Sequence, residues 1–308
     1  MKRNFVLLAA LTIGLSITSC FRDNFNLAEK EITFASNIQK LVPASRVVDN
    51  LWDESDSIGI YMVSEESMDI VDAAENIQYV ASASGAEGSF LAKDNPIYFP
   101  DNGDKVRFLA YHPYNSKVID RVYKVDVSDQ SNQSAIDLLY SFNPDALYSK
   151  ETKNERVSLS FDHMLTKIII NVKPGDGLSA TDLENIETVL TGVNREVEFD
   201  LNAVDFQNYA NKGTISPRKT EVKNGYSISY EAIVVPTIDV LGAQIVFDLK
   251  NGIEGENIAS DVFRWDFDAT LIRSTRYIYN VTINRSGITV ESSINDWLSG
   301  GESDISAE

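Results

Sequence analysis

The sequence is poor in the side chains on which many enzymes and metal sites depend. Its 308 residues include one cysteine and two histidines. A single cysteine excludes a disulfide within the chain. The spaced patterns HExxH, CxxC, GxSxG, GxGxxG and the phosphate-binding GxxxxGK are absent as well. These absences argue against the enzyme classes that such motifs identify, and we expect neither an enzyme nor a bound cofactor.

Positive charge is also scarce. The chain carries 27 Lys and Arg against 46 Asp and Glu, which gives a formal net charge of −19. Nucleic-acid binding needs clustered basic side chains, so nucleic acid is not an expected partner. Folding could bring some of the many carboxylates together as an acid–base pair. Since no pair stands out among them, we assign no catalytic residue.

Long apolar runs are confined to the start of the chain. Lys2 and Arg3 precede the mostly apolar segment Phe5–Ile17, which has the layout of a bacterial secretion signal and is short for a membrane-spanning helix. The sequence Ile17-Thr18-Ser19-Cys20 resembles a lipobox, in which the cysteine becomes the first mature residue and carries acyl chains such as palmitate. We therefore expect a lipoprotein signal peptide over residues 1–19 and lipidation at Cys20, which would anchor the protein firmly to a membrane. The alternative is an ordinary signal peptide with an incidental Cys20.

Helical periodicity is thin, whereas strand patterns are frequent. The segments Ser158–Phe161, Glu196–Leu201 and Ser227–Ile233 alternate between polar and apolar residues. Asn-Gly and Ser-Gly pairs between the strand-like segments are typical of tight turns. The pattern predicts an all-β protein built of antiparallel β-sandwiches. Five β-branched or aromatic runs predict strands buried on both faces: Ile58–Val63, Val106–Tyr111, Ile168–Val172, Ile245–Leu249 and Tyr277–Ile283.

One apolar segment is compatible with two kinds of element. Leu183, Ile186 and Leu190 would share one face of a short helix that begins after Ser179 or Thr181. The residues from Ile186 to Leu190 would equally form a strand with alternating faces. Both interpretations stay open.

The polar, charged stretch Ser149–Arg156 separates two strand-rich regions. We expect an N-terminal β-sandwich domain over residues 47–150 and a C-terminal one over 156–298, both of ordinary domain size. Residues 299–308 are rich in Gly, Ser and acidic side chains and are expected to form a flexible tail.

Three features of the sequence are candidate sites of chemistry. His112 and His163 stand at strand ends beside apolar residues, where a structural imidazole is the usual role. The segment Asp126–Asp137 spaces oxygen-bearing side chains as in a calcium loop. However, Ser131 replaces the turn glycine and Asp137 replaces the bidentate glutamate. We expect a polar surface loop there and no metal site.

Four segments carry a family resemblance when they are taken in order. They are SRVVDNLWDESDSIGIYMV (Ser45–Val63), IYFPDNGDKVRFLAYHPY (Ile97–Tyr114), LSFDHMLTKIIINV (Leu159–Val172) and RYIYNVTINRSGITVESSINDWLSG (Arg276–Gly300). Together they resemble the fimbrillin family of Bacteroidetes surface proteins, the lipoprotein-derived, Mfa-like type V pilins. The resemblance implies two transthyretin-like β-sandwich domains in a protein exported to the outer membrane.

The resemblance also implies a mode of assembly. In polymerising members a trypsin-like protease cuts after Arg or Lys just before the first domain and removes the lipidated leader with one strand. A strand from the next subunit then fills the exposed groove. Here the matching cleavage position is Arg46, with Lys40 as another possible site. The leader is then 20–46, and its alternating segment around Ile32 and Phe34 is the removable strand.

The donor strand is expected near the C-terminal end of the matching region. Residues 301–308 are polar and would make a poor donor. A donor would therefore include Ile288 and Val290, or Ile294 and Trp297.

The resemblance implies a structural subunit of an adhesive surface fimbria, located at the outer membrane and in the fimbrium. Its expected partners are other fimbrillin subunits, the outer membrane through lipid on Cys20, and the maturing protease. The alternative is a surface lipoprotein that does not polymerise, and that either binds glycans or anchors a fimbria. The sequence leaves the choice among stalk, tip and anchor open.

Overall fold

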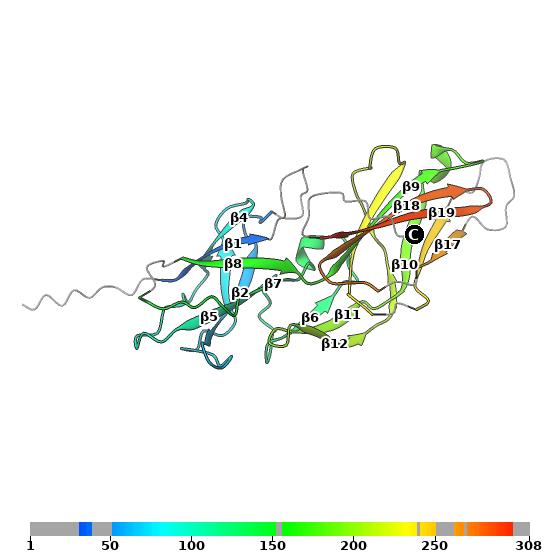
Figure 1. Ribbon diagram of the computed structural model, residues 1–308. Coiled ribbons are helices and arrows are strands. Elements are labelled where there is room, and N and C mark those ends of the chain that lie inside the picture. The colour runs from blue at the N-terminus through cyan, green and yellow to red at the C-terminus, as the bar shows by residue number, and fades with distance from the viewer. Residues whose placement is uncertain are drawn as a thin grey trace, which may run out of the picture. The chain divides into compact units, whose positions relative to one another are not determined.

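The computed structural model describes residues 31–38, 51–151, 156–238, 241–250, 262–267 and 270–297. Within these ranges the chain is built almost entirely of β-strands (Figure 1), and the helical segments are the short 3-10 helices η2 (Gln133–Ala135) and η3 (Ala180–Leu183). The all-β prediction is confirmed.

Seven strands form a sheet that closes on itself, which we call the barrel. All neighbouring strands in it are antiparallel except β1 and β8, which run parallel. Because β1 pairs with β4 on one side and with β8 on the other, it is the strand that completes the ring. In order of pairing the strands are β1 (Thr33–Ile38), β4 (Glu87–Ala92), β3 (Ile77–Ala81), β2 (Ser57–Ser64), β5 (Val106–His112), β7 (Leu139–Phe142) and β8 (Arg156–His163).

The remaining strands of the described chain form three open sheets. The first is β13 (Gly213–Ile215), β10 (Ile186–Val193), β16 (Gln244–Leu249) and β17 (Val262–Asp266). The second is β14 (Arg218–Lys219), β15 (Ile228–Val234), β9 (Thr166–Pro174), β18 (Thr275–Asn284) and β19 (Gly287–Asp296). The third is β12 (Asp205–Ala210), β11 (Glu196–Asp200) and β6 (Val122–Asp126).

Two hydrophobic clusters explain the continuous apolar runs. Ile58, Ile60 and Met62 of β2 lie in the cluster that fills the barrel, whereas Tyr61 and Val63 of the same strand lie in the other cluster. The side chains of β5 divide in the same way. Because successive side chains of a strand point to opposite faces, a strand with an apolar cluster on each face must be apolar throughout.

The ambiguous segment contains both kinds of element in sequence. Ser179 and Asp182 form a capping box around η3, with the Ser179 amide donating to Asp182 Oδ2 at 2.7 Å. The helical turn ends at Leu183, and β10 begins at Ile186 and pairs with β16 over Ile186–Thr191. The strand interpretation therefore holds for the residues from Ile186 to Leu190.

Strand pairing crosses the expected linker in both directions. β8 begins at Arg156 but belongs to the barrel, and β6, which precedes the linker, pairs with β11. The division into domains over 47–150 and 156–298 therefore stays a prediction, and the linker residues 152–155 lie outside the described ranges.

Candidate functional site: the slot occupied by β1

The segment around Ile32 and Phe34 forms β1, which occupies a slot between β4 and β8 (Figure 1). Its removal stays a prediction. Phe34 is paired with Phe90 of the antiparallel neighbour and with Val157 of the parallel one. The parallel ladder to β8 runs the whole length of β1, from Thr33 to Ile38. We call the space between β4 and β8 the β1 slot.

Alternate side chains of this segment face the barrel interior. Ile32, Phe34, Ser36 and Ile38 are all buried, and Ile32 and Phe34 have no exposed surface at all. The Phe34 ring makes edge-to-face contacts with Tyr79 at 4.8 Å and Phe108 at 5.2 Å between ring centroids. These contacts have the geometry that aromatic rings prefer, and Phe34 is the largest buried side chain of β1.

Hydrogen bonds fix the beginning of the strand. The Ile32 amide donates to the Ile97 carbonyl at 3.0 Å, and the Ile97 amide donates to the Tyr79 hydroxyl at 2.8 Å. That hydroxyl in turn donates to the Ile32 carbonyl at 3.4 Å. Burial raises the pKa of Tyr79 to about 12, because the charged phenolate is disfavoured away from water.

The middle of the β1 slot is tightly packed around a glycine of β4. Gly88 is paired with Ser36. A Cβ at Gly88 would lie 2.4 Å from the Phe90 ring, 2.7 Å from Ser36 Oγ and 3.0 Å from Trp52. The space beside Gly88 is therefore already filled by Phe90, Ser36 and Trp52. The buried Ser36 hydroxyl has no hydrogen-bond partner among the described residues.

Trp52 lines the slot and is held independently of β1. Its backbone exchanges two hydrogen bonds with Gly85, at 2.8 and 2.9 Å. Its ring packs edge-to-face against Phe90, His112 and Phe161. The chain that follows the expected cleavage position is thus tied to the barrel by contacts of its own.

The expected donor residues lie on β19, at the end of the five-stranded sheet. β19 pairs with β18 over ten residue pairs, from Thr275–Asp296 to Asn284–Gly287, and it has no second partner strand in the described part of the chain. Ile288 and Val290 are partly buried, and Ile294 is 45% exposed.

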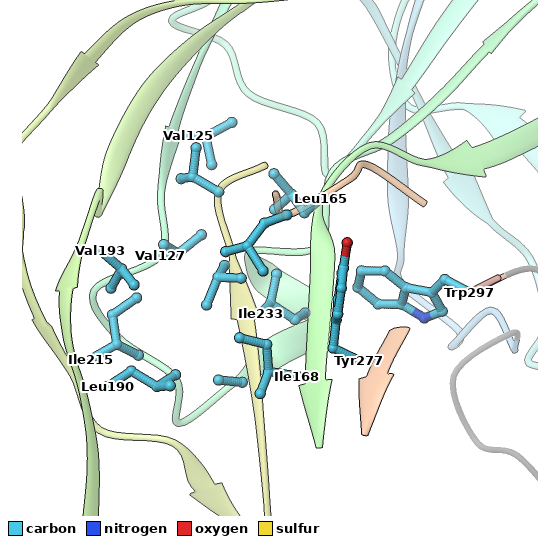
Figure 2. Close-up of a cluster of buried hydrophobic side chains, with 14 of the residues drawn as sticks. Val125, Val127, Leu165, Ile168, Leu190, Val193, Ile215, Ile233, Tyr277 and Trp297 are labelled. Carbon is cyan, nitrogen blue, oxygen red and sulfur yellow. The ribbon is translucent and has the colours of Figure 1, made fainter. Parts of the chain in front are cut away.

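Trp297 holds the end of this segment. Its ring stacks on His163 with centroids 4.1 Å apart and planes 6° apart, and its amide donates to the Ser274 carbonyl at 2.7 Å. Figure 2 shows Trp297 among the buried side chains of the larger hydrophobic cluster, to which Tyr277 also belongs.

Both histidines are buried and engaged by neighbouring groups. His112 Nδ1 lies 3.0 Å from the Ser57 carbonyl, and burial lowers the pKa of this histidine. His163 Nδ1 lies 2.9 Å from Asp137 Oδ2. Both imidazoles therefore have the surroundings expected of a structural role: Nδ1 of His112 faces a carbonyl, and Nδ1 of His163 faces a carboxylate.

Polar side chains of the segment Asp126–Asp137 form hydrogen bonds within the protein. The side-chain amide of Gln130 donates through Nε2 to the Val127 carbonyl at 2.7 Å and to the Ile233 carbonyl at 2.9 Å. Asp137 faces His163. No group of three or more His, Cys, Asp or Glu placed to hold a metal ion is found within the described ranges.

Several predicted positions lie outside the described residues. These are the signal peptide 1–19, Cys20, Lys40, Arg46 and the tail 299–308. In the part of the chain that the structure describes, no helix has the length and apolarity to cross a membrane.

Sequence reasoning missed the residues of β3 and β4 that shape the slot. Tyr79 lies in a strand whose polarity pattern is weak, so nothing marks its hydroxyl as a tie to β1. Gly88 had a usable signal, because an isolated glycine within a strand often marks a close approach of another chain segment.

Comparison with known proteins identifies the family of this chain. The family model for fimbrillin-like proteins matches residues 45–297. The chain belongs to the fimbrillin-like family. The matched range begins after β1, so it contains both walls of the slot but not the strand that fills it.

Relatives of this fimbrillin-like chain have been described in Bacteroides. A candidate fimbrium subunit, Fim1C of Bacteroides uniformis, is 30% identical over 265 residues, which are 83% of this chain and 82% of the relative. A crystal structure of a candidate cell adhesion protein from the same species is 26% identical, with a TM-score of 0.70 over 88% of this chain and 98% of that chain. One from Bacteroides ovatus has the same fold, with 23% identity, a TM-score of 0.68 and the same coverage.

Proposed function

We propose that this protein is a structural subunit of an adhesive surface fimbria that assembles by exchange of β1 for a strand of another subunit. Membership in the fimbrillin-like family and the similarity to Fim1C support a fimbrial role at the cell surface. Its partners are then other fimbrillin subunits.

The observation that carries the proposal is the position of β1. This strand precedes the family-matched range, yet it completes the barrel and buries Phe34 fully between aromatic side chains. If β1 leaves, β4 and β8 each present unpaired N–H and C=O groups beside an apolar groove, which is a strong template for an incoming strand. We expect the remaining barrel to stay folded, because the contacts of Trp52 with Gly85, Phe90, His112 and Phe161 do not involve β1.

Export and maturation complete the proposal. Lipid on Cys20 would hold the precursor at the outer membrane. Cleavage near Arg46 would then separate the lipidated leader and β1 from the rest of the chain. Arg46 lies between β1 and Trp52 in the sequence, so a cut there leaves both slot walls on one fragment.

Limited proteolysis of the purified precursor tests this function. Trypsin should cut near Arg46 and give ladders that resist SDS, because an exchanged strand is paired on both sides. Replacing both basic residues, Arg46→Gln with Lys40→Gln, is the matched control and should leave a monomer. Mass spectrometry of the surface form should find an acylated Cys20 in the precursor and a mature chain beginning at Val47.

A chain that is cut near Arg46 and stays monomeric would contradict polymerisation. That outcome would favour an anchoring or glycan-binding surface lipoprotein instead. A glycan-binding site would need exposed aromatic side chains. Trp52 and Trp297 are buried, and Trp265 packs against Phe267 and Tyr279.

A further inference from the structure

A cavity lies in the wall of the barrel where one strand is shorter than its neighbour. β7 ends at Phe142 and pairs with β8 at only two positions near the end of β8. β8 begins at Arg156, and residues 143–148, which follow β7, form no strand pairing with its first half. The space between this loop and β8, which we call the β8 cavity, has a volume of about 210 Å³.

Hydrogen bonds to β5 hold the loop over this cavity in place. The Pro144 carbonyl accepts from Arg107 Nε at 2.7 Å. At the far end of the loop, Tyr148 and Val106 exchange two backbone hydrogen bonds, at 3.0 and 2.9 Å. The cavity is therefore kept open by the fold itself, as binding sites for small molecules usually are.

The lining of the β8 cavity combines aromatic rings with uncharged polar groups and a single carboxylate. The aromatic residues are Phe108, Phe142 and Tyr148, and the last two are partly exposed. No lysine, arginine or histidine is among the described residues that line it. The polar side chains of the lining are those of Ser141, Asn143, Ser158, Ser160 and Asp162.

Asp162 is the charged group of this cavity, and its carboxylate lacks a hydrogen-bond donor. The side chain is partly buried and forms no hydrogen bond or ion pair with the described residues. Burial raises the pKa of Asp162, although His163 and Arg273 act in the opposite direction. A partly buried carboxylate without a donor costs stability, so a ligand that donates hydrogen bonds would satisfy it.

Two further side chains of the lining have unused hydrogen-bonding capacity. Asn143 Oδ1 accepts from the Asp145 amide at 3.0 Å, which leaves the NH₂ group of Asn143 to donate. Ser141 Oγ accepts from the Ser160 amide at 3.1 Å and can still donate its own proton. The cavity therefore offers both donors and an acceptor to a polar ligand.

Charge and size together narrow the class of ligand. A calcium ion takes six to eight oxygen ligands, several of them usually carboxylates, whereas this lining has one carboxylate. An anion would meet Asp162 without a basic side chain to offset it. An engineered cavity of about 150 Å³ holds a benzene ring, so the β8 cavity has room for one six-membered ring with substituents.

The edge of β8 is also closed to an extended peptide. The Ser160 amide is bound by Ser141 Oγ, and the Ser158 carbonyl accepts from the Tyr148 hydroxyl at 3.4 Å. Strand addition needs such backbone groups unpaired. A neutral ring with hydroxyl groups fits the lining better than a peptide does.

We propose that the β8 cavity binds one ring of a neutral sugar. Asp162 accepts hydrogen bonds from the sugar hydroxyls, Asn143 donates to one of them, and the rings of Phe142 and Tyr148 contact the C–H groups. The proposal goes beyond fibre assembly, because none of the lining residues belongs to β1. The uncut precursor and the exchanged subunit would carry the same site, which would give the fimbria a ligand for adhesion.

Saturation-transfer NMR of the purified, uncut precursor tests the site. The probes are the methyl glycosides of glucose, galactose, mannose and fucose. At least one should bind, with a dissociation constant on the order of 1 mM, because a single polar ring buries little apolar surface. Saturation transfer to none of the four would overturn the proposal.

Two substitutions locate the bound sugar. Asp162→Asn keeps the size of the side chain but removes its charge, and it should weaken binding at least roughly tenfold, because charge-assisted hydrogen bonds are the stronger ones. Ala146→Phe fills the cavity and should abolish binding. Asp145→Asn is the matched control, since Asp145 is an exposed residue of the same loop that does not line the cavity, and binding should be unchanged.

Urea denaturation separates a binding role of Asp162 from a structural one. Asp162→Asn should unfold at the same urea concentration as the wild type or at a higher one, because the carboxylate has no partner to lose. Sugar binding that survives both Asp162→Asn and Ala146→Phe, or that is lost equally in Asp145→Asn, would overturn the proposal. Ladders after cleavage near Arg46 should form equally in Asp162→Asn and the wild type, so strand exchange is judged separately.

Discussion

Residues 32–38, at β1, read ITFASNI, and residues 288–294 of β19 read ITVESSI. The two segments therefore carry nearly the same side chains, but in opposite situations. β1 has a partner strand on each side, and its four inward-facing residues are buried. β19 lies at the end of an open sheet, and the matching residues are partly buried or exposed. The contrast shows that burial of a strand is decided by what flanks it, and that one sequence pattern can be used fully in one place and weakly in another.

The two places also differ in what holds the strand. β1 is held by side chains packed inside a closed ring, with the Tyr79 hydroxyl fixing its beginning. β19 is held by its ladder to β18 and by Trp297 at its end. Substitutions of matched residues should therefore have large effects in the first place and small ones in the second.

The largest difference is expected between the central residues of the two strands. Phe34→Ala should lower the free energy of unfolding by about 3–5 kcal/mol, because it removes a fully buried ring and leaves a cavity. Val290→Ala should cost about 1 kcal/mol, since fewer atoms are lost from a partly buried site. Urea denaturation of both variants measures the two values.

Equal losses in free energy of unfolding for Phe34→Ala and Val290→Ala would contradict the expected difference between β1 and β19. Phe34→Val provides a control of intermediate size, because it makes the two strands match at this position. Its free energy of unfolding should fall between those of the wild type and Phe34→Ala.

Substitutions of two glycines should distinguish the steric role of a glycine from its conformational role. Gly88→Ala should cost about 1–3 kcal/mol, because the added methyl collides with Phe90 and Ser36 and the core must shift. Gly287, which begins β19, has a φ of 152° and nothing within 4 Å of an added Cβ. Gly287→Ala should cost about 1 kcal/mol through backbone strain alone.

A second substitution distinguishes the two mechanisms. Ser36→Gly makes room beside Gly88 and should recover part of the stability lost in Gly88→Ala. The same change should have no effect on Gly287→Ala. Urea denaturation of the two double variants provides the measurement, and recovery in both would show that the effect at Gly88 is not steric.

Tyr79 gives the β1 slot a dependence on alkaline pH. The pKa of this tyrosine is raised from 10.0 to about 12 in the folded protein. The hydroxyl therefore contributes stability that is fully present below pH 10 and is lost as the pH rises from 10 towards 12. Tyr79→Phe should cost about 1 kcal/mol at neutral pH, because the buried Ile97 amide loses its acceptor.

The variant should also lose less stability than the wild type between pH 10 and 12. Other tyrosines titrate there too, since burial also raises the pKa of Tyr123 to about 12. The informative quantity is therefore the difference between the two proteins at each pH. If the difference in free energy of unfolding between the wild type and Tyr79→Phe is constant from pH 10 to 12, ionisation of Tyr79 does not affect stability in this range.

The strands themselves were readable from the sequence because apolar periodicity reflects burial directly. The run Ile58–Val63 predicted a strand buried on both faces, and β2 lies between two hydrophobic clusters. The alternation around Ile32 and Phe34 likewise predicted a strand, and β1 is present there.

The walls of the slot were not readable, because they depend on which distant strands become neighbours. The parallel pairing of β1 with β8 joins residues more than a hundred positions apart, and no local pattern encodes such a contact. The tie from Tyr79 to Ile32 has the same origin. The polar stretch Ser149–Arg156 suggested a domain boundary, which stays a prediction, and β8, which begins at Arg156, pairs within the barrel.

The smallest expected effect on the isolated protein concerns Ile294. Its side chain is 45% exposed, so Ile294→Ala should lower the free energy of unfolding of the uncut chain by only about 0.5 kcal/mol. As one of the expected donor residues, Ile294 would be buried inside the slot after exchange, and there the loss should reach about 2–4 kcal/mol. The variant should therefore match the wild type in urea denaturation yet form far fewer SDS-resistant ladders after cleavage. Thr289→Ala, on the outward face of β19, is the control that should leave both measurements nearly unchanged. Ladders of wild-type stability in Ile294→Ala would mean that this isoleucine stays in its own sheet when the fibre forms.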